Sequence, residues 1–170
     1  MPPDGEGGDR VAIREATPGD FRAVSDLFEE VDRPHREHLP DLFRKAQGAP
    51  REESYINELI AKPDAAVFVA EAGTGVVGLL VVKIHSTPDV SILVPLDYVV
   101  IDTIVVTTDA RRRGVGRALM VQAEAWARAQ GVDRIELNVF EFNEVAADFY
   151  HGLGYATLSR RMVKRFNADA

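Results

Sequence analysis

The sequence has no cysteine in its 170 residues, which excludes disulfides, zinc–thiolate sites and any mechanism that holds an acyl group on a thiol. It also has no apolar run close to the roughly 20 residues that would span a bilayer, so we expect a soluble protein with no membrane partner. Acidic residues outnumber basic ones, 27 against 20, and the net charge is −7. This charge argues against general binding of nucleic acid, because a protein that follows a phosphate backbone needs a broad basic face.

The size and composition are those of one globular domain with a sizeable core, since 46% of the residues are hydrophobic and 28% are charged. The opening MPPDGEGGDR lacks the basic and then apolar order of a secretory signal, so we expect a cytoplasmic protein. Its glycine, proline and acidic residues predict a disordered tail over residues 1–9. The folded domain is expected over residues 10–167.

Hydrophobic periodicity predicts the elements of the first half of the chain. Residues 11–16, VAIREA, alternate like a strand, and a helix is expected over residues 17–31, before a proline-containing stretch. A second helix is expected over residues 51–61, REESYINELIA. Residues 65–84 then have the pattern of two strands joined by a tight Gly-Thr-Gly turn, which predicts an antiparallel hairpin.

In the second half, residues 97–107 are apolar at nearly every position, which predicts a central strand buried on both faces. A helix over residues 114–130, a strand over 134–140, a helix over 143–153 and two short strands over 155–166 are expected to follow. The element order is therefore β-α-α-β-β-β-α-β-α-β-β. It predicts a single α/β (α+β) domain with a central mixed, mostly antiparallel sheet of about seven strands flanked by about four helices.

The segment TTDARRRGVGRAL places three consecutive arginines, Arg111, Arg112 and Arg113, at a predicted helix start. Cations are disfavoured there, because free N–H groups and the helix dipole already make a helix N-terminus electropositive. Gly114 and Gly116 would let an anionic ligand approach the backbone, and arginine donors suit phosphate oxygens. The segment therefore predicts a pyrophosphate site. The alternative is a set of solvated arginines around a sharp turn.

Two motifs of the chain resemble those of the GNAT superfamily of N-acetyltransferases. VVTTDARRRGVGRALM is similar to the family's acyl-CoA-binding motif, with Arg111, Gly114 and Gly116 at its defining positions, and VFEFNEVAADFYHGLGY resembles its Asn, small residues, Tyr, Gly-aromatic segment. The resemblance implies an acetyl-CoA site, with the pyrophosphate on the N–H groups of residues 112–117. The cofactor-binding residues that it implies are Ile104, Val105, Val106, Arg111, Arg112, Arg113, Gly114, Val115, Gly116, Arg117, Asn143, Ala146 and Tyr150.

The second motif also has a geometric basis. Asn143 and Tyr150 are seven residues apart and therefore lie on one helix face, with Ala146 and Ala147 between them. Small residues between two polar groups leave room for an extended chain such as pantetheine. The alternatives are a helix cap for Asn143 and a core aromatic for Tyr150.

Asp102 interrupts the apolar strand, and alternation puts it on one face with Val100, Ile104 and Val106. A carboxylate in a buried strand must be paired or open onto a cavity. The resembled family often has an acidic residue near this position, facing the acceptor. The resemblance therefore implies that Asp102 anchors the acceptor amine or acts as general base, and the alternative is a structural ion pair.

The resemblance further implies that Tyr150 protonates the departing thiolate and that the N–H of Val106 stabilises the oxyanion. We therefore expect an acetyl-CoA-dependent N-acetyltransferase that works by direct attack in a ternary complex, without a metal. The acidic surplus favours a cationic acceptor, a small molecule or a peptide, such as a polyamine, an aminoglycoside or a lysine side chain. The alternative is a non-catalytic CoA-binding sensor or scaffold. A homodimer is compatible with the sequence, although no feature decides it.

Overall fold

A computed structural model describes residues 11–73 and 75–166. The tail expected at residues 1–9, the expected domain ends at residues 10 and 167, and the central residue of the Gly-Thr-Gly turn lie outside the described residues. The chain forms two compact units, Met1–Asn138 and Val139–Ala170, which are described in turn.

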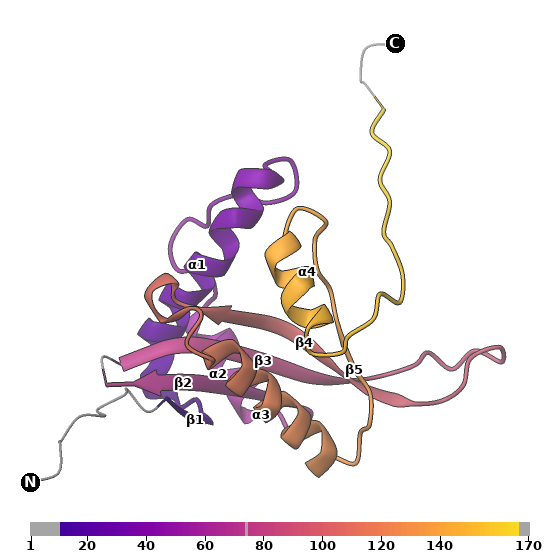
Figure 1. The fold of residues 1–170 in the computed structure, drawn as a ribbon, viewed down its shortest axis with the longest axis horizontal. Coiled ribbons are helices and arrows are strands. Elements are labelled where there is room, and N and C mark those ends of the chain that lie inside the picture. The colour runs from indigo at the N-terminus through magenta and orange to yellow at the C-terminus, as the bar shows by residue number, and fades with distance from the viewer. Residues whose placement is uncertain (1–10, 74, 167–170) are drawn as a thin grey trace, which may run out of the picture. The chain divides into compact units, whose positions relative to one another are not determined.

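Within the described residues, the first unit contains a five-stranded sheet in the order β1-β2-β3-β4-β5 (Figure 1). The strands are β1 (Ala12–Glu15), β2 (Ala65–Ala72), β3 (Gly75–Ser86), β4 (Asp97–Val106) and β5 (Ile135–Leu137). Strands β1 to β4 pair antiparallel, and β5 pairs parallel with β4. The sheet is therefore mixed and mostly antiparallel, as the sequence predicts.

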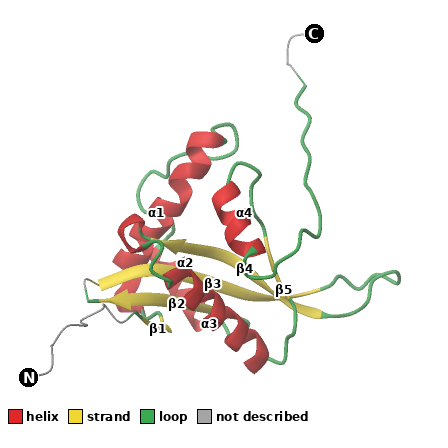
Figure 2. Cartoon of the chain, in the orientation of Figure 1, coloured by secondary structure: helices red, strands yellow, loops and turns green. Residues whose placement is uncertain are grey.

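The helices surround this sheet in the first unit, and one more helix lies in the second unit (Figure 2). The α-helices are α1 (Phe21–His38), α2 (Glu53–Ala61), α3 (Val115–Ala129) and α4 (Glu144–His151), and the 3-10 helices are η1 (Pro18–Asp20) and η2 (Thr108–Ala110). The predicted α+β class is confirmed. The helix α1 is longer than expected, because it continues through Pro34 instead of ending before it.

Helices α1 and α2 cover one face of the sheet, where they form the main hydrophobic core. The buried side chains of this core are Val24, Leu27 and Phe28 of α1, Ile56 and Leu59 of α2, Val67 and Val69 of β2, Leu79 and Val81 of β3, and Val105 of β4. Helix α3 packs against the other face, where Gly78 allows a close approach. A Cβ on Gly78 would lie 3.2 Å from Cδ1 of Leu119 and 3.3 Å from the carbonyl oxygen of Val105.

The start of α1 is tied to the sheet edge by Arg14 of β1. Its guanidinium donates to both carboxylate oxygens of Asp20 at 2.8 Å and to Glu71 of β2 at 2.7 Å. Asp20 also accepts from the N–H and the hydroxyl of Thr17, the residue that the sequence marks as the helix start. These hydrogen bonds from Arg14 and Thr17 hold the pKa of Asp20 far below its usual value, although its partial burial acts in the opposite direction.

The described sheet has five strands where the sequence predicts about seven. Residues 155–166, expected to form two short strands, belong to no helix or strand, and β5 covers Ile135–Leu137 instead of residues 134–140. Both differences have the same cause. A strand forms only where its backbone has a neighbour to pair with, and β-propensity alone does not supply one.

Candidate active site

Strand β4 contains a β-bulge at Asp102. Val81 of β3 lies opposite Thr103, whereas the next residue of β3, Val82, lies opposite Ile101. Asp102 is therefore an extra residue with no partner of its own in the ladder. The alternation of side chains along β4 is shifted by one residue across this point.

Because of the bulge, the predicted placement of Asp102 is wrong in part. Strict alternation puts Asp102 on one face with Val100, Ile104 and Val106, but only Val100 shares its face in the structure. Val100 lies opposite Lys83, and Lys83 contacts Asp102, so these side chains share one face. Ile104 and Val106 point to the other face, because the bulge displaces the alternation by one residue. Asp102 lies on the sheet face that α1 and α2 cover.

The Asp102 carboxylate is paired with Lys83, whose Nζ lies 3.2 Å from Oδ1. The same Nζ donates to the hydroxyl of Tyr55 on α2 at 3.3 Å. Burial acts to lower the pKa of Lys83, but the charge of Asp102 and the hydrogen bonds to Asp102 and Tyr55 offset it and leave that pKa raised. The ion pair that the sequence left as an alternative is thus present. The Asp102 side chain is still 40% exposed, so a cationic ligand could reach it.

Beyond the bulge, the outer edge of β4 separates from β5. The two strands pair only from Val99 to Ile101. The N–H of Thr107 donates to the carbonyl of Val77, so the ladder alternation turns the N–H and C=O groups of Val106 and Ile104 away from β3. Both residues therefore aim backbone donors at the side of β4 that no described strand covers.

The turn after β4 leads directly into the N-terminus of α3. Two of its residues have left-handed backbone, Arg112 with φ 61° and Gly114 with φ 82°. Gly114 caps α3, and the first intrahelical hydrogen bond runs from the N–H of Ala118 to the Gly114 carbonyl at 2.9 Å. The N–H groups of residues 115–117 precede it and have no acceptor in their own helix. The turn thus has several backbone N–H groups without an acceptor in their own helix, which is the arrangement that an anion site at a helix N-terminus requires.

The three arginines of the turn differ in their surroundings. Arg112 and Arg113 are exposed. Arg111 donates from Nε to the carbonyl of Val106 at 3.0 Å and from Nη2 to Glu30 of α1 at 3.2 Å. Its guanidinium therefore helps to fix the turn, and part of its donor capacity is already used.

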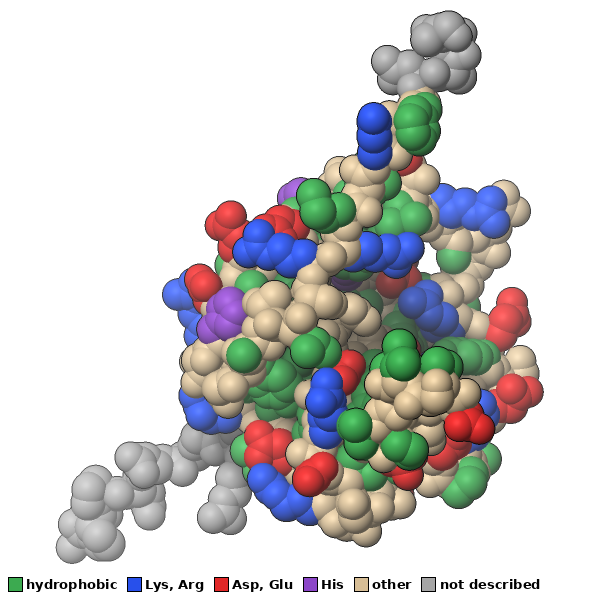
Figure 3. Space-filling view, turned by 90° about the vertical axis from the view of Figure 1, so that its right-hand side faces the viewer, with side chains coloured by type: hydrophobic (Ala, Val, Ile, Leu, Met, Phe, Trp, Pro, Cys, Tyr) green, Lys and Arg blue, Asp and Glu red, His purple; other side chains and the backbone are tan. Residues whose placement is uncertain are grey.

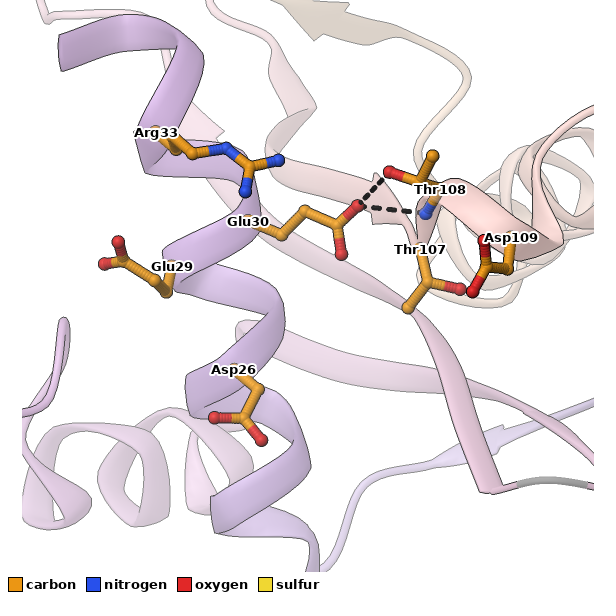
Figure 4. Close-up of a pocket in the computed structure, with 7 residues that line it drawn as sticks. All are labelled: Asp26, Glu29, Glu30, Arg33, Thr107, Thr108 and Asp109. Carbon is orange, nitrogen blue, oxygen red and sulfur yellow. Dashed lines mark hydrogen bonds between the residues drawn. The ribbon is translucent and has the colours of Figure 1, made fainter. Parts of the chain in front are cut away.

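Glu30 links α1 to this turn, and the sequence gives no sign of it. One carboxylate oxygen, Oε1, accepts from the N–H and the hydroxyl of Thr108, both at 2.9 Å (Figure 4). The same oxygen also accepts from Nη2 of Arg111. The partners lie about 80 residues away in the sequence, so no local pattern could reveal them. A carboxylate that accepts three hydrogen bonds holds the end of β4 and the arginine segment in one arrangement.

Replacing Glu30 with alanine is expected to weaken the predicted binding of coenzyme A about tenfold. Without this carboxylate, the ligand itself must order the turn, which would reduce the free energy of binding by about 1.4 kcal/mol. Isothermal titration calorimetry with coenzyme A measures this. The matched control is Glu29→Ala, since Glu29 pairs with Arg36 within α1. Equal affinity in the Glu30→Ala variant would show that the turn keeps its arrangement without this carboxylate.

A cavity of about 450 Å³ opens beside Glu30, between α1 and the turn (Figure 4). Its lining consists of Asp26, Glu29, Glu30 and Arg33 of α1 with Thr107, Thr108 and Asp109. Four carboxylates against one guanidinium give the cavity an acidic character. None of the site residues predicted from the sequence lines it.

The second unit contains the second motif. Asn143 precedes α4 and caps it, since its side-chain oxygen accepts from the N–H of Ala146 at 3.2 Å. Asn143, Ala146 and Ala147 are half-buried and Tyr150 is buried, while Val145 is 81% exposed. The four residues thus share one face, as the seven-residue spacing predicts, and Asn143 has the capping role that the sequence left open.

Tyr150 lies among aromatic rings. Its ring centroid is 5.3 Å from that of Phe149 and 5.9 Å from that of Tyr155. Burial, and to a smaller degree the charge of Tyr155, raises the pKa of Tyr150 to about 12. Its hydroxyl therefore keeps its proton throughout the neutral range and is able to donate it.

The first unit thus places the backbone groups of Ile104 and Val106 at the outer edge of β4 and residues 111–117 around the start of α3, whereas Asp102 lies on a face of the sheet and the side chain of Val105 lies in the core. The second unit holds Asn143, Ala146 and Tyr150 on one face of α4. Within residues 11–73 and 75–166, no group of three or more histidine, aspartate or glutamate side chains is arranged to hold a metal ion. The helices of the same part of the chain are too short or too polar to cross a bilayer.

A family model described as the Acetyltransferase (GNAT) family matches residues 25–155. The solved structure of a tetramutant of the BH1408 protein from Bacillus halodurans is 28% identical, with a TM-score of 0.86 over 91% of this chain and 99% of that one. A transcriptional regulator from Bacillus halodurans C-125 is 22% identical, with a TM-score of 0.71 over 92% and 100% of the two chains. AAC(6')-Iy, in complex with the bisubstrate analog CoA-S-monomethyl-acetylneamine, is 17% identical, with a TM-score of 0.69 over 94% and 99%. No curated protein matches the chain.

Proposed function

Because the chain belongs to the GNAT family of acetyltransferases, we propose that it transfers the acetyl group of acetyl-CoA to a primary amine by direct attack in a ternary complex. The observation that carries this proposal is the outer edge of β4 beyond Ile101, with which no described strand pairs. There, backbone donors of Ile104 and Val106 face away from β3 and lead into the donor-rich start of α3. An extended ligand that ends in a pyrophosphate matches this row of donors.

The donor half of the site would hold acetyl-CoA through backbone groups and arginines. The N–H groups of residues 112–117, with Arg112 and Arg113, would bind the pyrophosphate, and Ile104 and Val106 would line the pantetheine chain. Val105 would not contact this chain, because its side chain lies in the core and its backbone pairs with β3. Asn143, Ala146 and Tyr150 would contact the same substrate from α4. Support comes from AAC(6')-Iy, which has the same fold and binds a bisubstrate analog that contains CoA.

The reaction would need one group to accept a proton and one to donate one. The amine nitrogen attacks the thioester carbonyl, a C–N bond forms, and the N–H of Val106 stabilises the oxyanion. When the C–S bond breaks, the thiolate takes the proton of Tyr150, whose raised pKa keeps it protonated until that moment. Asp102 would anchor the amine or take its proton, directly or through water.

We propose a cationic acceptor, a small molecule or a peptide. The net charge of −7 and the exposed carboxylate of Asp102 support this, because both attract an ammonium group. The test is a panel of amines, including polyamines, aminoglycosides and lysine peptides, with acetyl-CoA as donor. Since the chain has no cysteine, a thiol-reactive dye reports only the CoA that turnover releases. Binding of CoA without release on any amine would favour the non-catalytic module instead.

The role of Asp102 can be separated from that of its ion pair. Asp102→Asn is expected to lower kcat/KM for the acceptor about tenfold or more and to leave CoA affinity unchanged, because the carboxylate is lost at the acceptor side. Lys83→Met removes the same ion pair but keeps the carboxylate, so it serves as the matched control. If both variants lose only a little stability, up to about 1 kcal/mol, and keep their steady-state kinetics, Asp102 is structural.

A further inference from the structure

Lys83 places a primary amine of the chain beside the proposed acceptor anchor. Its Nζ is 3.2 Å from Oδ1 of Asp102, the carboxylate that would hold an external ammonium group. Both side chains reach solvent, with exposed fractions of 26% for Lys83 and 40% for Asp102. The place that a cationic acceptor would take is therefore already occupied by an amine of the protein itself.

The ion pair alone would not distinguish Lys83 from other charged side chains. Figure 3 shows basic side chains (blue) and acidic side chains (red) interspersed on one face of the molecule, and surface pairs of this kind contribute little to stability. The position of Lys83 is different, because its partner Asp102 directly follows Ile101, the last residue of β4 that pairs with β5. From this point on, no described strand pairs with the outer edge of β4. The amine of Lys83 is thus held where the proposed acetyl-CoA site begins.

The distance from this amine to the thioester is the distance that any acceptor held by Asp102 would have to cover. The thioester would lie along the open edge of β4, where the N–H groups of Ile104 and Val106 face away from β3. Ile104 is two residues beyond Asp102, which corresponds to about 7 Å along a strand. The amine of a lysine sits on a flexible four-carbon stem, so rotations of the Lys83 side chain can carry it toward this edge.

We propose that Lys83 is itself an acetyl acceptor, so that each chain acetylates the lysine of its own acceptor site. This inference rests on the proposed acetyltransferase activity and names a further substrate of the same site. The Lys83 ammonium gives one proton to Asp102, and the neutral amine attacks the thioester carbonyl and forms a C–N bond. The C–S bond breaks, and the thiolate leaves as CoA with the proton of Tyr150. The new amide nitrogen releases its second proton to water, from which Tyr150 regains its own.

The modification would change the acceptor site itself. Acetylation removes the positive charge of Lys83, so Asp102 loses its partner and is left to an external ammonium group. Burial acts to lower the pKa of Lys83, but Asp102 and Tyr55 leave it raised, so the charged pair is the resting state. Self-acetylation is therefore expected to be slow and to occur once in each chain.

Incubation of the full chain with acetyl-CoA that carries a deuterated acetyl group tests the proposal. The label separates new acetyl groups from any that the expression host added, and peptide mass spectrometry locates it among the four lysines of the chain. Lys62, which is exposed at the end of α2, reports the non-enzymatic background. Lys83 is expected to be labelled about tenfold faster than Lys62 or more, because acetyl-CoA is bound beside it. Its rate should saturate with acetyl-CoA and should not depend on the protein concentration.

The matched control is Gly114→Asp, which places a carboxylate in the proposed pyrophosphate site. This variant is expected to lose the label at Lys83 and to keep the background label at Lys62, because free acetyl-CoA still reaches an exposed lysine. Unlabelled acetyl groups that Lys83 already carries after purification support the proposal if Gly114→Asp from the same host lacks them. They count against it if the variant carries them equally.

Three results would overturn the proposal: labelling of Lys83 no faster than that of Lys62, a rate at Lys83 that rises with the protein concentration, or equal labelling of Lys83 in Gly114→Asp. The amine panel separates this failure from that of the proposed function. If amines of the panel are acetylated and Lys83 is not, the acetyltransferase activity stands and only this inference falls. If neither the amines nor Lys83 accept an acetyl group, the proposed function falls with it.

Discussion

Replacing Gly114 with aspartate is expected to lower the affinity for acetyl-CoA by about 100-fold or more, because a carboxylate beside the pyrophosphate costs several kcal/mol of like-charge repulsion. The fold should persist, since a Cβ at Gly114 would meet no atom within 4 Å. Calorimetry with CoA measures the loss, and the melting temperature without ligand checks the fold.

The control for this variant is Gly114→Asn, which isolates the charge. Gly114 has a left-handed backbone with φ 82°, and asparagine and aspartate tolerate this region better than other residues with a side chain. The two variants are nearly equal in shape, so backbone strain affects both alike. We expect Gly114→Asn to bind CoA much more tightly than Gly114→Asp. Equal affinities would mean that the start of α3 does not hold an anionic group.

Replacing Tyr150 with phenylalanine is expected to reduce kcat about 100-fold or more, as for the loss of a general acid, with at most about a twofold change in CoA affinity. The ring and its contacts with Phe149 and Tyr155 remain, and only the hydroxyl is lost. Steady-state kinetics on the best amine of the panel, with calorimetry for CoA, separates the two effects. Tyr155→Phe removes the neighbouring phenol and serves as the control. An unaltered kcat would remove Tyr150 from the mechanism.

The raised pKa of Tyr150 also predicts how stability depends on pH. Because the folded protein favours the neutral phenol, this contribution is fully present below pH 10, the ordinary pKa, and is lost as the pH rises toward about 12. The wild type should therefore lose up to about 2 to 3 kcal/mol of unfolding free energy over this interval, and Tyr150→Phe should lose less. Chemical denaturation at a series of alkaline pH values measures the difference. Parallel curves for the two proteins would contradict the burial of this hydroxyl.

The parts of the fold that local sequence determines were predictable. The turn into α3 follows from two glycines after a strand, and the face of α4 that holds Asn143 and Tyr150 follows from a seven-residue spacing. The length of α1 was not predictable. Pro34 suggests that the helix ends before it, but packing against the sheet lets the helix continue to His38. The absence of the two strands expected over residues 155–166 was not predictable either. Alternation shows that a segment can form a strand, but it does not show whether another strand is available to pair with it.

The candidate site was predictable where its residues are close in sequence. Glu30 and Lys83 escaped notice, because their partners in the turn and at the bulge are distant in the chain. Nothing in the composition of β4 indicates the bulge. Strict alternation therefore placed Asp102 correctly on the face of Val100 but wrongly on the face of Ile104. Long-range pairing, not local preference, decided these features.

The extra residue in β4 allows the strand to place on one face two side chains that strict alternation would separate. Val105 must point into the core under α1, and Asp102 must share that face three residues earlier, an odd separation that strict alternation forbids. If the same sequence paired with β3 in a regular ladder, either Val105 or Asp102 would point to the wrong side of the sheet. The side of the sheet on which the acid lies is therefore set by the irregular pairing at this one position, and not by the order of residues in the strand.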